Sequence, residues 1–497
     1  MNLRLNRLTA QLRSDVLQIW RAGVAAVDSE RLVRAALRVE GDRLLIGRPR
    51  LGPPDLAAAG DSQETIESID LSTVRRLIVV GAGKAGAGMA AGCAAALGPQ
   101  VMAAKELGGW LNVPADCVRE LPAVHLHAAR APGQNEPTPE GVAGAEEILR
   151  LVADAEPNDL CLALISGGAS ALLPAPAEGI TLADKLALTR HLSGAGADIH
   201  ELNTVRKQLS RIKGGGLAQA CRAGRLITLI ISDVIGDPLD VIGSGPTIDD
   251  PRSPADALAI LERFDARAAG ISERVFDYLS SQAGEKRPAP SCAVTNLIVA
   301  NIATAVDAAA DESRRMGYTP EIIPPVEREG LADEVGARLA HAAIALSKQP
   351  GPDCLVSGGE PVVKLAESSI RGLGGRNQQL TLAALQVFAA EGSSDVALVS
   401  GGTDGEDGPC DAAGAVVDAQ VIAAAQAAGL DAADYLRRNA AYHFFEPLGA
   451  LIKTGPTQTN VGDLRVAVTA RVTAAQDNSL GATAGSSSSA KSTAEHC

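Results

Sequence analysis

The chain contains 497 residues, of which 46% are hydrophobic and only 2% aromatic, and its formal net charge is −14. The length predicts two to four domains, and the negative charge argues against binding to nucleic acid or to an anionic membrane surface. Eight cysteines without CxxC spacing indicate reduced thiols rather than a zinc site or a disulfide framework. Since no apolar run approaches about 18 residues, we expect a cytoplasmic protein without a transmembrane helix.

The N-terminal segment is predicted to form one amphipathic helix. Its apolar residues follow helical spacing at Leu17, Ile19, Trp20 and Val24. Three arginines precede the first acidic residue, a pattern that also resembles a mitochondrial presequence, and we favour the structural helix. At the other end, residues 474–497 are rich in Ala, Ser, Thr and Gly, which predicts a disordered tail because they bury too little apolar surface to fold.

A glycine-rich turn follows the first clearly predicted strand. Residues 78–86 read IVVGAGKAG and lead into an Ala-rich helical pattern. Backbone N–H groups at such a junction favour anions, and Lys84 would face the anion that they hold. The spacing Gly81-x-Gly83-x-x-Gly86 also matches the dinucleotide-binding fingerprint, and a tight turn without a ligand is the simpler alternative.

Strand and helix patterns alternate from this turn onward, which predicts a parallel sheet with helices on both faces. Further apolar runs that end in small or polar residues are found at residues 161–165, 226–231, 297–300, 354–356 and 396–399. Residues 251–290 lack a clear strand. We therefore divide the chain into an N-terminal α/β domain (1–250), an inter-domain helical segment (251–290) and a C-terminal α/β domain (291–473).

Two glycine-rich loops are predicted to contact the phosphates of a nucleotide, because each offers backbone N–H groups together with a hydroxyl or an amine. The residues concerned are Gly167, Gly168 and Ser170 in the first loop, and Lys213, Gly214 and Gly215 in the second. The alternatives are an ordinary strand–helix connection for the first loop and a solvated basic helix face for the second. A serine nucleophile is disfavoured, because the first loop does not form a G-x-S-x-G elbow.

Charged side chains follow other predicted strands. Asp233 could hold a metal ion or accept a proton, and Arg376, which follows a glycine loop, could grip a carboxylate or phosphate at two points. Asp404 and Asp407 lie in an acidic glycine loop, which indicates a hydrated divalent cation but not an EF-hand. Residues 453–460, KTGPTQTN, offer hydroxyls and amides to a small polar substrate.

Seven blocks, in order, resemble the ATP-dependent glycerate 2-kinases that carry a C-terminal MOFRL domain. They read SGGASALLPAP, LNTVRKQLSRIKGGGLA, SDVIGDPLDVIGSGPT, SGGEP, GGRNQQL, SGGTDGEDGPCDAAGA and KTGPTQTNV. The resemblance implies two α/β domains, the first Rossmann-like with a mostly parallel sheet and the second MOFRL-like from about residue 350, with the active site in the cleft between them. It also implies transfer of the γ-phosphoryl group of ATP to the 2-hydroxyl of D-glycerate, with a divalent cation. No Walker A motif occurs, so the phosphates would be held on a different scaffold.

The resemblance assigns roles to individual positions. Lys84 and Arg376 correspond to the substrate-binding lysine and arginine of the family, and we add Asn203 as a further substrate contact. Gln379 stands where glutamate is common and Ala169 replaces the third glycine of SGGGSALL, but neither departure removes a site residue.

The expected mechanism depends on positioning and charge neutralisation rather than on a strong base. ATP phosphates would lie against the two glycine loops. Mg²⁺ would be held, largely through water, by Asp233 together with Asp404 or Asp407. If a general base acts, Asp233 is the residue that we expect to supply it.

Two other functions stay open. An NAD(P)-dependent hydroxy-acid oxidoreductase would use the glycine turn as its fingerprint and Glu106 for the ribose, but would leave Lys84 and the acidic loop unexplained. A non-catalytic anion-binding protein would bind glycerate without releasing ADP. In each case we expect a monomer or a homodimer with a small-molecule ligand and no nucleic-acid or membrane partner.

Overall fold

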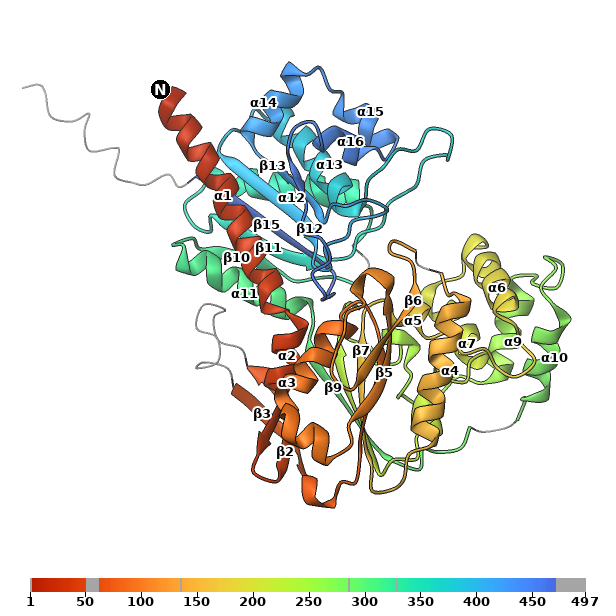
Figure 1. The fold of residues 1–497 in the computed structure, drawn as a ribbon. Coiled ribbons are helices and arrows are strands. Elements are labelled where there is room, and N and C mark those ends of the chain that lie inside the picture. The colour runs from red at the N-terminus through yellow and green to blue at the C-terminus, as the bar shows by residue number, and fades with distance from the viewer. Residues whose placement is uncertain (1, 51–61, 135, 285–286, 328, 471–497) are drawn as a thin grey trace, which may run out of the picture.

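The structure is a computed structural model that describes residues 2–50, 62–134, 136–284, 287–327 and 329–470, so the predicted tail at 474–497 lies outside the described residues. Three sheets organise the described residues: a six-stranded parallel sheet, a six-stranded mixed sheet and a three-stranded antiparallel sheet (Figure 1). The two large sheets belong to two α/β domains, which confirms the predicted fold class.

The parallel sheet has the strand order β6-β5-β4-β7-β8-β9, and every pairing in it is parallel. Its strands are β4 (Leu77–Ala82), β5 (Gly108–Pro114), β6 (Val124–Arg130), β7 (Leu160–Ser166), β8 (Arg225–Ile231) and β9 (Ala293–Ala300). Leu77 and Val79 pack in the same core as α3 (Gly86–Ala104), whereas Ile78 and Val80 pack in the same core as α4 (Pro139–Ala153). Because successive strand residues face opposite sides, this division shows that helices cover both faces.

The second sheet has the order β10-β11-β15-β12-β13-β14 and is mixed rather than parallel. Its strands are β10 (Pro320–Ile323), β11 (Cys354–Gly359), β12 (Val396–Gly402), β13 (Gly414–Val417), β14 (Leu451–Ile452) and β15 (Asp463–Thr469). The last strand, β15, lies antiparallel between β11 and β12. The expectation of parallel strands throughout is therefore wrong for this sheet, because a strand that is buried on both faces has the same apolar pattern in either direction.

Helices also cover both faces of the mixed sheet. On one face α1 (Asn2–Ala26) packs against α11 (Ile302–Arg315), and on the other α12 (Ala332–Ser347) packs against α13 (Arg376–Ala390) (Figure 1). The three shorter helices of this domain are α14 (Ala419–Ala427), α15 (Ala432–Arg437) and α16 (Ala441–Phe445). The predicted N-terminal helix is thus present, and its Trp20 is fully buried and donates to the carbonyl oxygen of Leu464 on β15 at 3.1 Å.

Two segments cross the predicted domain boundaries. β9 pairs with β8 and completes the first sheet, although residues 291–473 were expected to form the C-terminal domain. Conversely, α1 packs on β15 and β12 of the second sheet, although it precedes the first domain in sequence. Local composition marked residues 251–290 as strand-free, but it carries no information about which sheet a neighbouring element joins.

The described residues of the predicted inter-domain segment, 251–284 and 287–290, lie between β8 and β9 of the same sheet rather than between the two large sheets. Their helices α9 (Pro254–Arg263) and α10 (Glu273–Ser281) share a separate apolar core with α6 (Leu182–Gly194) and α7 (Ile199–Gln208). In Figure 1 this helical cluster lies to the right of the parallel sheet, beyond α4.

The remaining elements cover the parallel sheet or its loops. They are α2 (Ser29–Ala36), β1 (Leu37–Glu40), β2 (Arg43–Arg50), β3 (Ser62–Asp70), α5 (Ala169–Leu172) and α8 (Gly216–Ala220). Among the described residues one helix, α3, is long and apolar enough to cross a membrane by length and composition. It is kinked at Gly98, next to Pro99, and packs against α2 and the parallel sheet, as a core helix does.

Candidate functional site

The glycine turn after β4 is closed by the protein itself. The N–H groups of Lys84 and Ala85 donate to the carbonyl oxygen of Gly167 (2.9 Å) and to the hydroxyl of Ser166 (3.0 Å). A Cβ at Gly83 would lie 2.0 Å from the Ser166 hydroxyl oxygen, so only glycine permits this approach of the two loops. These N–H groups are therefore not available to a dinucleotide pyrophosphate, and the tight-turn interpretation describes this turn best.

Lys84 reaches across to the mixed-sheet domain. Its ammonium group donates to the carboxylates of Asp404 at 2.7 Å and Glu406 at 2.5 Å, both in the loop after β12. Burial by itself lowers the pKa of Lys84, but the charges of Asp404 and Glu406 outweigh it, so that the pKa lies above its ordinary value. Lys84 is thus a permanent cation at the contact between the two domains.

Arg376 is the first residue of α13 and is held by carboxylates of its own domain. Nε and Nη2 of its guanidinium donate to the two carboxylate oxygens of Asp463, at 2.7 and 3.1 Å. Its Nη1 lies 2.8 Å from a carboxylate oxygen of Glu360. No ion pair joins Lys84 and Arg376 to a shared group among the described residues. That both side chains surround one small anion stays a prediction, and the charge of Asp404, the partner of Lys84, acts on Glu360, a partner of Arg376.

Asp233 follows β8 and faces the other domain. Its carboxylate accepts a hydrogen bond of 3.0 Å from the side-chain amide of Asn460, which lies before β15. Burial, with a contribution from the nearby carboxylate of Glu360, raises the pKa of Asp233 to about 7. An acid with this pKa can exchange a proton near neutral pH.

Arg130, which the sequence analysis did not identify, belongs to the same site. It is the last residue of β6 and 5% exposed, and a Cβ at Gly168 would lie 3.4 Å from its guanidinium and 3.5 Å from the side chain of Lys84. Its position at a strand end is the signal that could have revealed it, but residues 124–130 were not recognised as a strand. Asp463 was likewise missed, although it directly follows Gly462 after the KTGPTQTN block.

The two predicted phosphate loops lie next to each other, and the groups that were expected to bind phosphate make hydrogen bonds within the protein. The Lys213 ammonium is buried and donates to the carbonyl oxygen of Ser170 at 2.8 Å, and the Ser170 hydroxyl lies 2.9 Å from that of Ser244. The N–H groups of Gly214 and Gly215 donate to the carbonyl oxygens of Ser244 and Gly245 at 3.0 and 2.8 Å. These two N–H groups are therefore used within the protein, which corrects their assignment to phosphate.

The charge state of Lys213 follows from its surroundings. Burial, together with the neighbouring cations Arg206 and Lys185, holds the pKa of Lys213 well below its ordinary value. Asn203, assigned to the substrate, lies buried on α7, and its side chain makes no hydrogen bond to another residue of the described ranges. Lys213 and Asn203 thus belong to the loops and helices that support the site rather than to the charged cluster around Lys84.

Asp407 has a structural role that was not foreseen. Its two carboxylate oxygens accept the N–H groups of Asn377 (2.9 Å) and Gln378 (2.8 Å) in the first turn of α13. A Cβ at Gly375 would lie 2.3 Å from the Asp407 carboxyl carbon, so the helix start is built around this side chain. Asp407 therefore caps the start of α13, and its assignment as a metal ligand stays a prediction.

The remaining acids fit a divalent cation loosely. Within the described ranges no group of three or more His, Cys, Asp or Glu side chains is arranged as a metal site. Mg²⁺, however, usually takes one or two carboxylates and completes its shell with water and substrate phosphate. Asp233 and Asp404, which lie close enough for the charge of one to affect the other, satisfy that weaker requirement.

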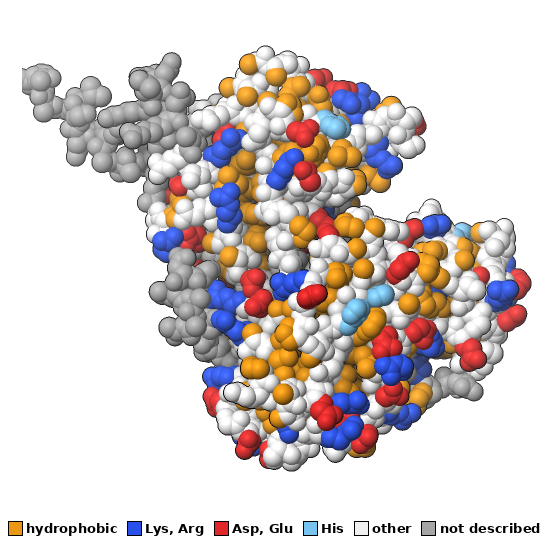
Figure 2. All heavy atoms as spheres, in the orientation of Figure 1, with side chains coloured by type: hydrophobic (Ala, Val, Ile, Leu, Met, Phe, Trp, Pro, Cys, Tyr) orange, Lys and Arg blue, Asp and Glu red, His pale blue; other side chains and the backbone are white. Residues whose placement is uncertain are grey.

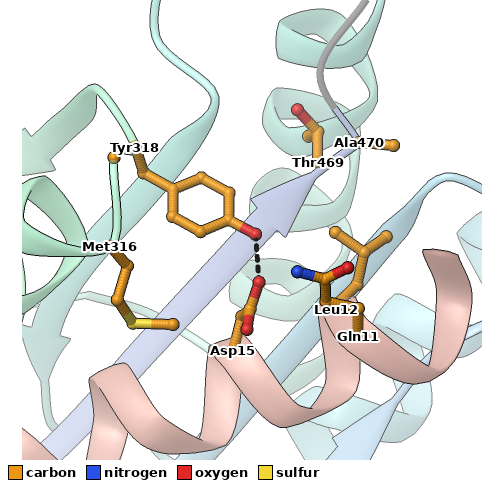
Figure 3. Close-up of a pocket in the computed structure, with 8 residues that line it drawn as sticks. Gln11, Leu12, Asp15, Met316, Tyr318, Thr469 and Ala470 are labelled. Carbon is orange, nitrogen blue, oxygen red and sulfur yellow. Dashed lines mark hydrogen bonds between the residues drawn. The ribbon is translucent and has the colours of Figure 1, made fainter.

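A cavity of about 460 Å³ opens between the domains beside this cluster. It is lined by Asp116 and Gly133 of the first domain and by Glu406, Asp411 and their neighbours of the second. Figure 2 shows the molecule hollowed between its upper and lower halves. A second cavity, of about 180 Å³, lies beside α1, where Tyr318 donates to Asp15 at 2.7 Å (Figure 3). It contains no lysine or arginine in its lining and is a poor anion site.

Comparisons with known proteins agree with the two-domain organisation. The family model of a domain of unknown function, DUF4147, matches residues 15–280, and that of the MOFRL family matches residues 353–463. A protein named glycerate kinase from Rattus norvegicus is 36% identical over 451 residues, which cover 79% of this chain and 84% of that protein.

Two further relatives extend the comparison. A protein named putative hydroxypyruvate reductase from Agrobacterium vitis is 39% identical over 408 residues, which cover 78% of this chain and 86% of that protein. The crystal structure of a glycerate kinase from Thermotoga maritima has a TM-score of 0.74 and 31% identity, and the match covers 93% of this chain and 100% of that one. The arrangement of two α/β domains is therefore shared with a solved relative over its whole length.

Proposed function

Because this chain belongs to the glycerate kinase family, with an N-terminal DUF4147 domain and a C-terminal MOFRL domain, we propose that it transfers the γ-phosphoryl group of ATP to the 2-hydroxyl of D-glycerate. The products are 2-phosphoglycerate and ADP. The observation that carries the proposal is the contact of Lys84 with Asp404 and Glu406, which joins the carboxyl ends of β4 and β12 at one charged cluster. Ligands of open α/β sheets bind at such ends.

The cations of the cluster act on the transferred group. Lys84, Arg130 and Arg376 are fixed by carboxylates and neighbouring loops, so they stabilise developing negative charge without reorganising at the moment of transfer. Nη1 of Arg376, the nitrogen that contacts Glu360, orients the glycerate carboxylate. The ATP phosphates lie against Gly167, Gly168 and the hydroxyl of Ser170.

The acids of the cluster position the acceptor. Five carboxylates, those of Asp233, Glu360, Asp404, Glu406 and Asp463, stand against three cations, so two anionic substrates need additional positive charge. Asp233 and Asp404 would hold Mg²⁺, which supplies that charge to the phosphates. Asp233 also accepts the proton of the 2-hydroxyl as the new bond forms. We further propose that the protein acts in the cytoplasm as a monomer or homodimer.

A phosphorus NMR spectrum of the reaction tests the proposal. The purified protein is incubated with ATP, Mg²⁺ and D-glycerate, and the expected new resonance is that of 2-phosphoglycerate, with ADP in equal amount. L-Glycerate and an EDTA-treated sample serve as controls. A spectrum of 3-phosphoglycerate would overturn the position of transfer, and the absence of ADP would overturn the kinase proposal.

An oxidoreductase is the second candidate, because a relative is named putative hydroxypyruvate reductase. The glycine turn argues against an oxidoreductase, because the N–H groups of Lys84 and Ala85 are hydrogen-bonded within the protein and cannot bind a dinucleotide pyrophosphate. Absorbance at 340 nm with hydroxypyruvate and NADH, in the absence of ATP, decides between the two. Steady oxidation of NADH would favour the reductase.

A further inference from the structure

Asn460 lies at the contact between the two domains with both ends of its amide engaged. Its Nδ2 donates to Oδ2 of Asp233 at 3.0 Å, and its Oδ1 accepts the N–H of Gly462 at 3.2 Å. Because a backbone N–H can only donate, the amide oxygen must face Gly462, and the NH₂ group must face Asp233. The orientation of the side chain is therefore determined by its own segment rather than by Asp233.

A third segment packs directly on this pair. A Cβ at Gly167, in the loop after β7, would lie 2.2 Å from Nδ2 of Asn460 and 2.3 Å from Oδ2 of Asp233. Both distances are far below van der Waals contact, so a side chain at position 167 would separate the amide from the carboxylate. The proposed phosphate loop is thus seated against the hydrogen bond between Asn460 and Asp233.

The segment that carries Asn460 is anchored to the acidic loop. The N–H of Thr457 donates to the carbonyl oxygen of Asp404 at 3.2 Å, and the N–H of Val461 donates to the hydroxyl of Thr403 at 3.0 Å. The position of the Asp233 carboxylate, which Asn460 holds, is consequently fixed relative to Asp404, although the two acids belong to different domains.

We propose that Asn460 is a positioning residue for phosphoryl transfer: its amide holds one oxygen of Asp233 and leaves the other directed at the reacting groups. The inference rests on the proposed function and deepens it, because it names the link by which the MOFRL domain aligns an acid of the parallel-sheet domain. The acceptor hydroxyl then meets a carboxylate whose position is set by both domains, and misplacement by about 1 Å is enough to cost about 10²-fold in rate.

A double-mutant cycle tests the proposal. Asn460→Ala, Asp233→Ala and the double variant are compared with the wild type for kcat, for the KM of glycerate and for the midpoint of thermal unfolding without substrates. We expect Asn460→Ala to lower kcat about 10- to 100-fold while the KM of glycerate changes less than about threefold. The double variant should be no slower than Asp233→Ala, and the unfolding midpoints should show the same coupling.

Independent losses would overturn the proposal, because kcat of the double variant would then fall by the product of the two single effects. Asn296→Ala is the matched control: this asparagine accepts from Thr247 at 2.6 Å within the first domain and should leave kcat unchanged. If Asn460→Ala does not fold, Gly167→Ala disturbs the same hydrogen bond from the other side and should likewise lower kcat more than it raises KM. A wild-type protein that forms no ADP defeats the kinase proposal itself, whereas an active wild type with additive variants defeats only the role of Asn460.

Discussion

At the scale of single residues, the cations of the site are held by carboxylates rather than left open. Lys84 is bonded to Asp404 and Glu406, and Arg376 to Asp463 and Glu360. Such pairs are partly buried, so removing one partner leaves charge without compensation. Under the proposed function, substrate phosphates would compete with these acids, and a divalent cation would supply additional positive charge.

Substitution of Lys84 tests its place in the reaction. Lys84→Ala should lower kcat/KM by about 10²-fold or more, because it removes a fixed charge from the transition state. Steady-state kinetics with glycerate and ATP measure the loss. Lys348→Ala, which removes an exposed lysine of the second domain, is the control and should have wild-type kinetics. Near-wild-type values for Lys84→Ala would contradict the assignment.

Substitution of Arg376 separates charge from geometry. Arg376→Ala should lower kcat/KM by about 10²-fold or more, and Arg376→Lys should recover little of it, because a lysine cannot reproduce the two-point contact with Asp463. The same kinetic assay measures both variants. Full recovery by lysine would show that only the charge matters.

At the scale of elements, α13 begins where the acidic loop supplies its cap. Asp407 satisfies two N–H groups that would otherwise have no partner in the first turn. The sequence shows the density of acids in this loop but not which groups each acid contacts. Asp404 faces the other domain and Asp407 faces its own helix, and only the path of the loop makes that distinction.

Loss of this cap should be visible in stability. Asp407→Ala should lower the free energy of unfolding by about 1–2 kcal/mol, as measured in urea. Asp431→Ala, which removes an exposed cap with one N–H bond at the start of α15, should cost less. Unchanged stability combined with a higher Mg²⁺ requirement would support the prediction that Asp407 is a metal ligand rather than a cap.

The helical cluster of α6, α7, α9 and α10 contains a buried amine. Lys185 on α6 donates to the carbonyl oxygens of Leu209 (2.7 Å) and Arg206 (3.4 Å), and burial, with the charge of Arg206, lowers its pKa to about 7. The unfolded chain keeps this proton up to a pH of about 10.4. Between these values the unfolded state binds more protons, so stability from this group rises with pH.

Replacement of Lys185 should remove that pH dependence. From pH 7 to pH 9, the free energy of unfolding of the wild type should increase relative to Lys185→Met, by at most about 1.4 kcal/mol per pH unit. Urea unfolding at both pH values measures the difference. Lys348→Met, at an exposed lysine, should follow the wild type. If the free energy of unfolding of the wild type instead fell with pH relative to Lys185→Met, folding would raise the pKa of Lys185 rather than lower it.

At the scale of the whole molecule, the two domains are tied together by segments that cross between them. α1 packs on the second sheet before the chain enters the first, and β9 completes the first sheet before the chain enters the second (Figure 1). Trp20 of α1 is 1% exposed, and a Cβ at Gly401 on β12 would lie 2.8 Å from its ring. The N-terminal helix is therefore part of the core of the second domain.

Truncation of this tryptophan should destabilise the molecule strongly. Trp20→Ala should cost about 3–5 kcal/mol, because it leaves a cavity and removes the hydrogen bond to Leu464. Chemical unfolding followed by circular dichroism measures the loss. Trp110→Ala, at a half-buried ring on β5, should cost less. A loss below about 1 kcal/mol would mean that α1 contributes little to folding.

The sequence by itself determined the α/β class, the family and most of the loops that reach the site, because apolar strands followed by glycines, hydroxyls and acids are local patterns. Lys84, Arg376, Asp233 and Asp404 were all predicted in this way, and their roles in the reaction stay predictions. What it could not determine was decided by contacts between distant segments: the antiparallel insertion of β15, the crossing of α1 and β9, and the cap formed by Asp407. Arg130 and the hydrogen bond from Asn460 to Asp233 depend on strands and loops that meet only after folding, and no spacing within one segment encodes such a meeting.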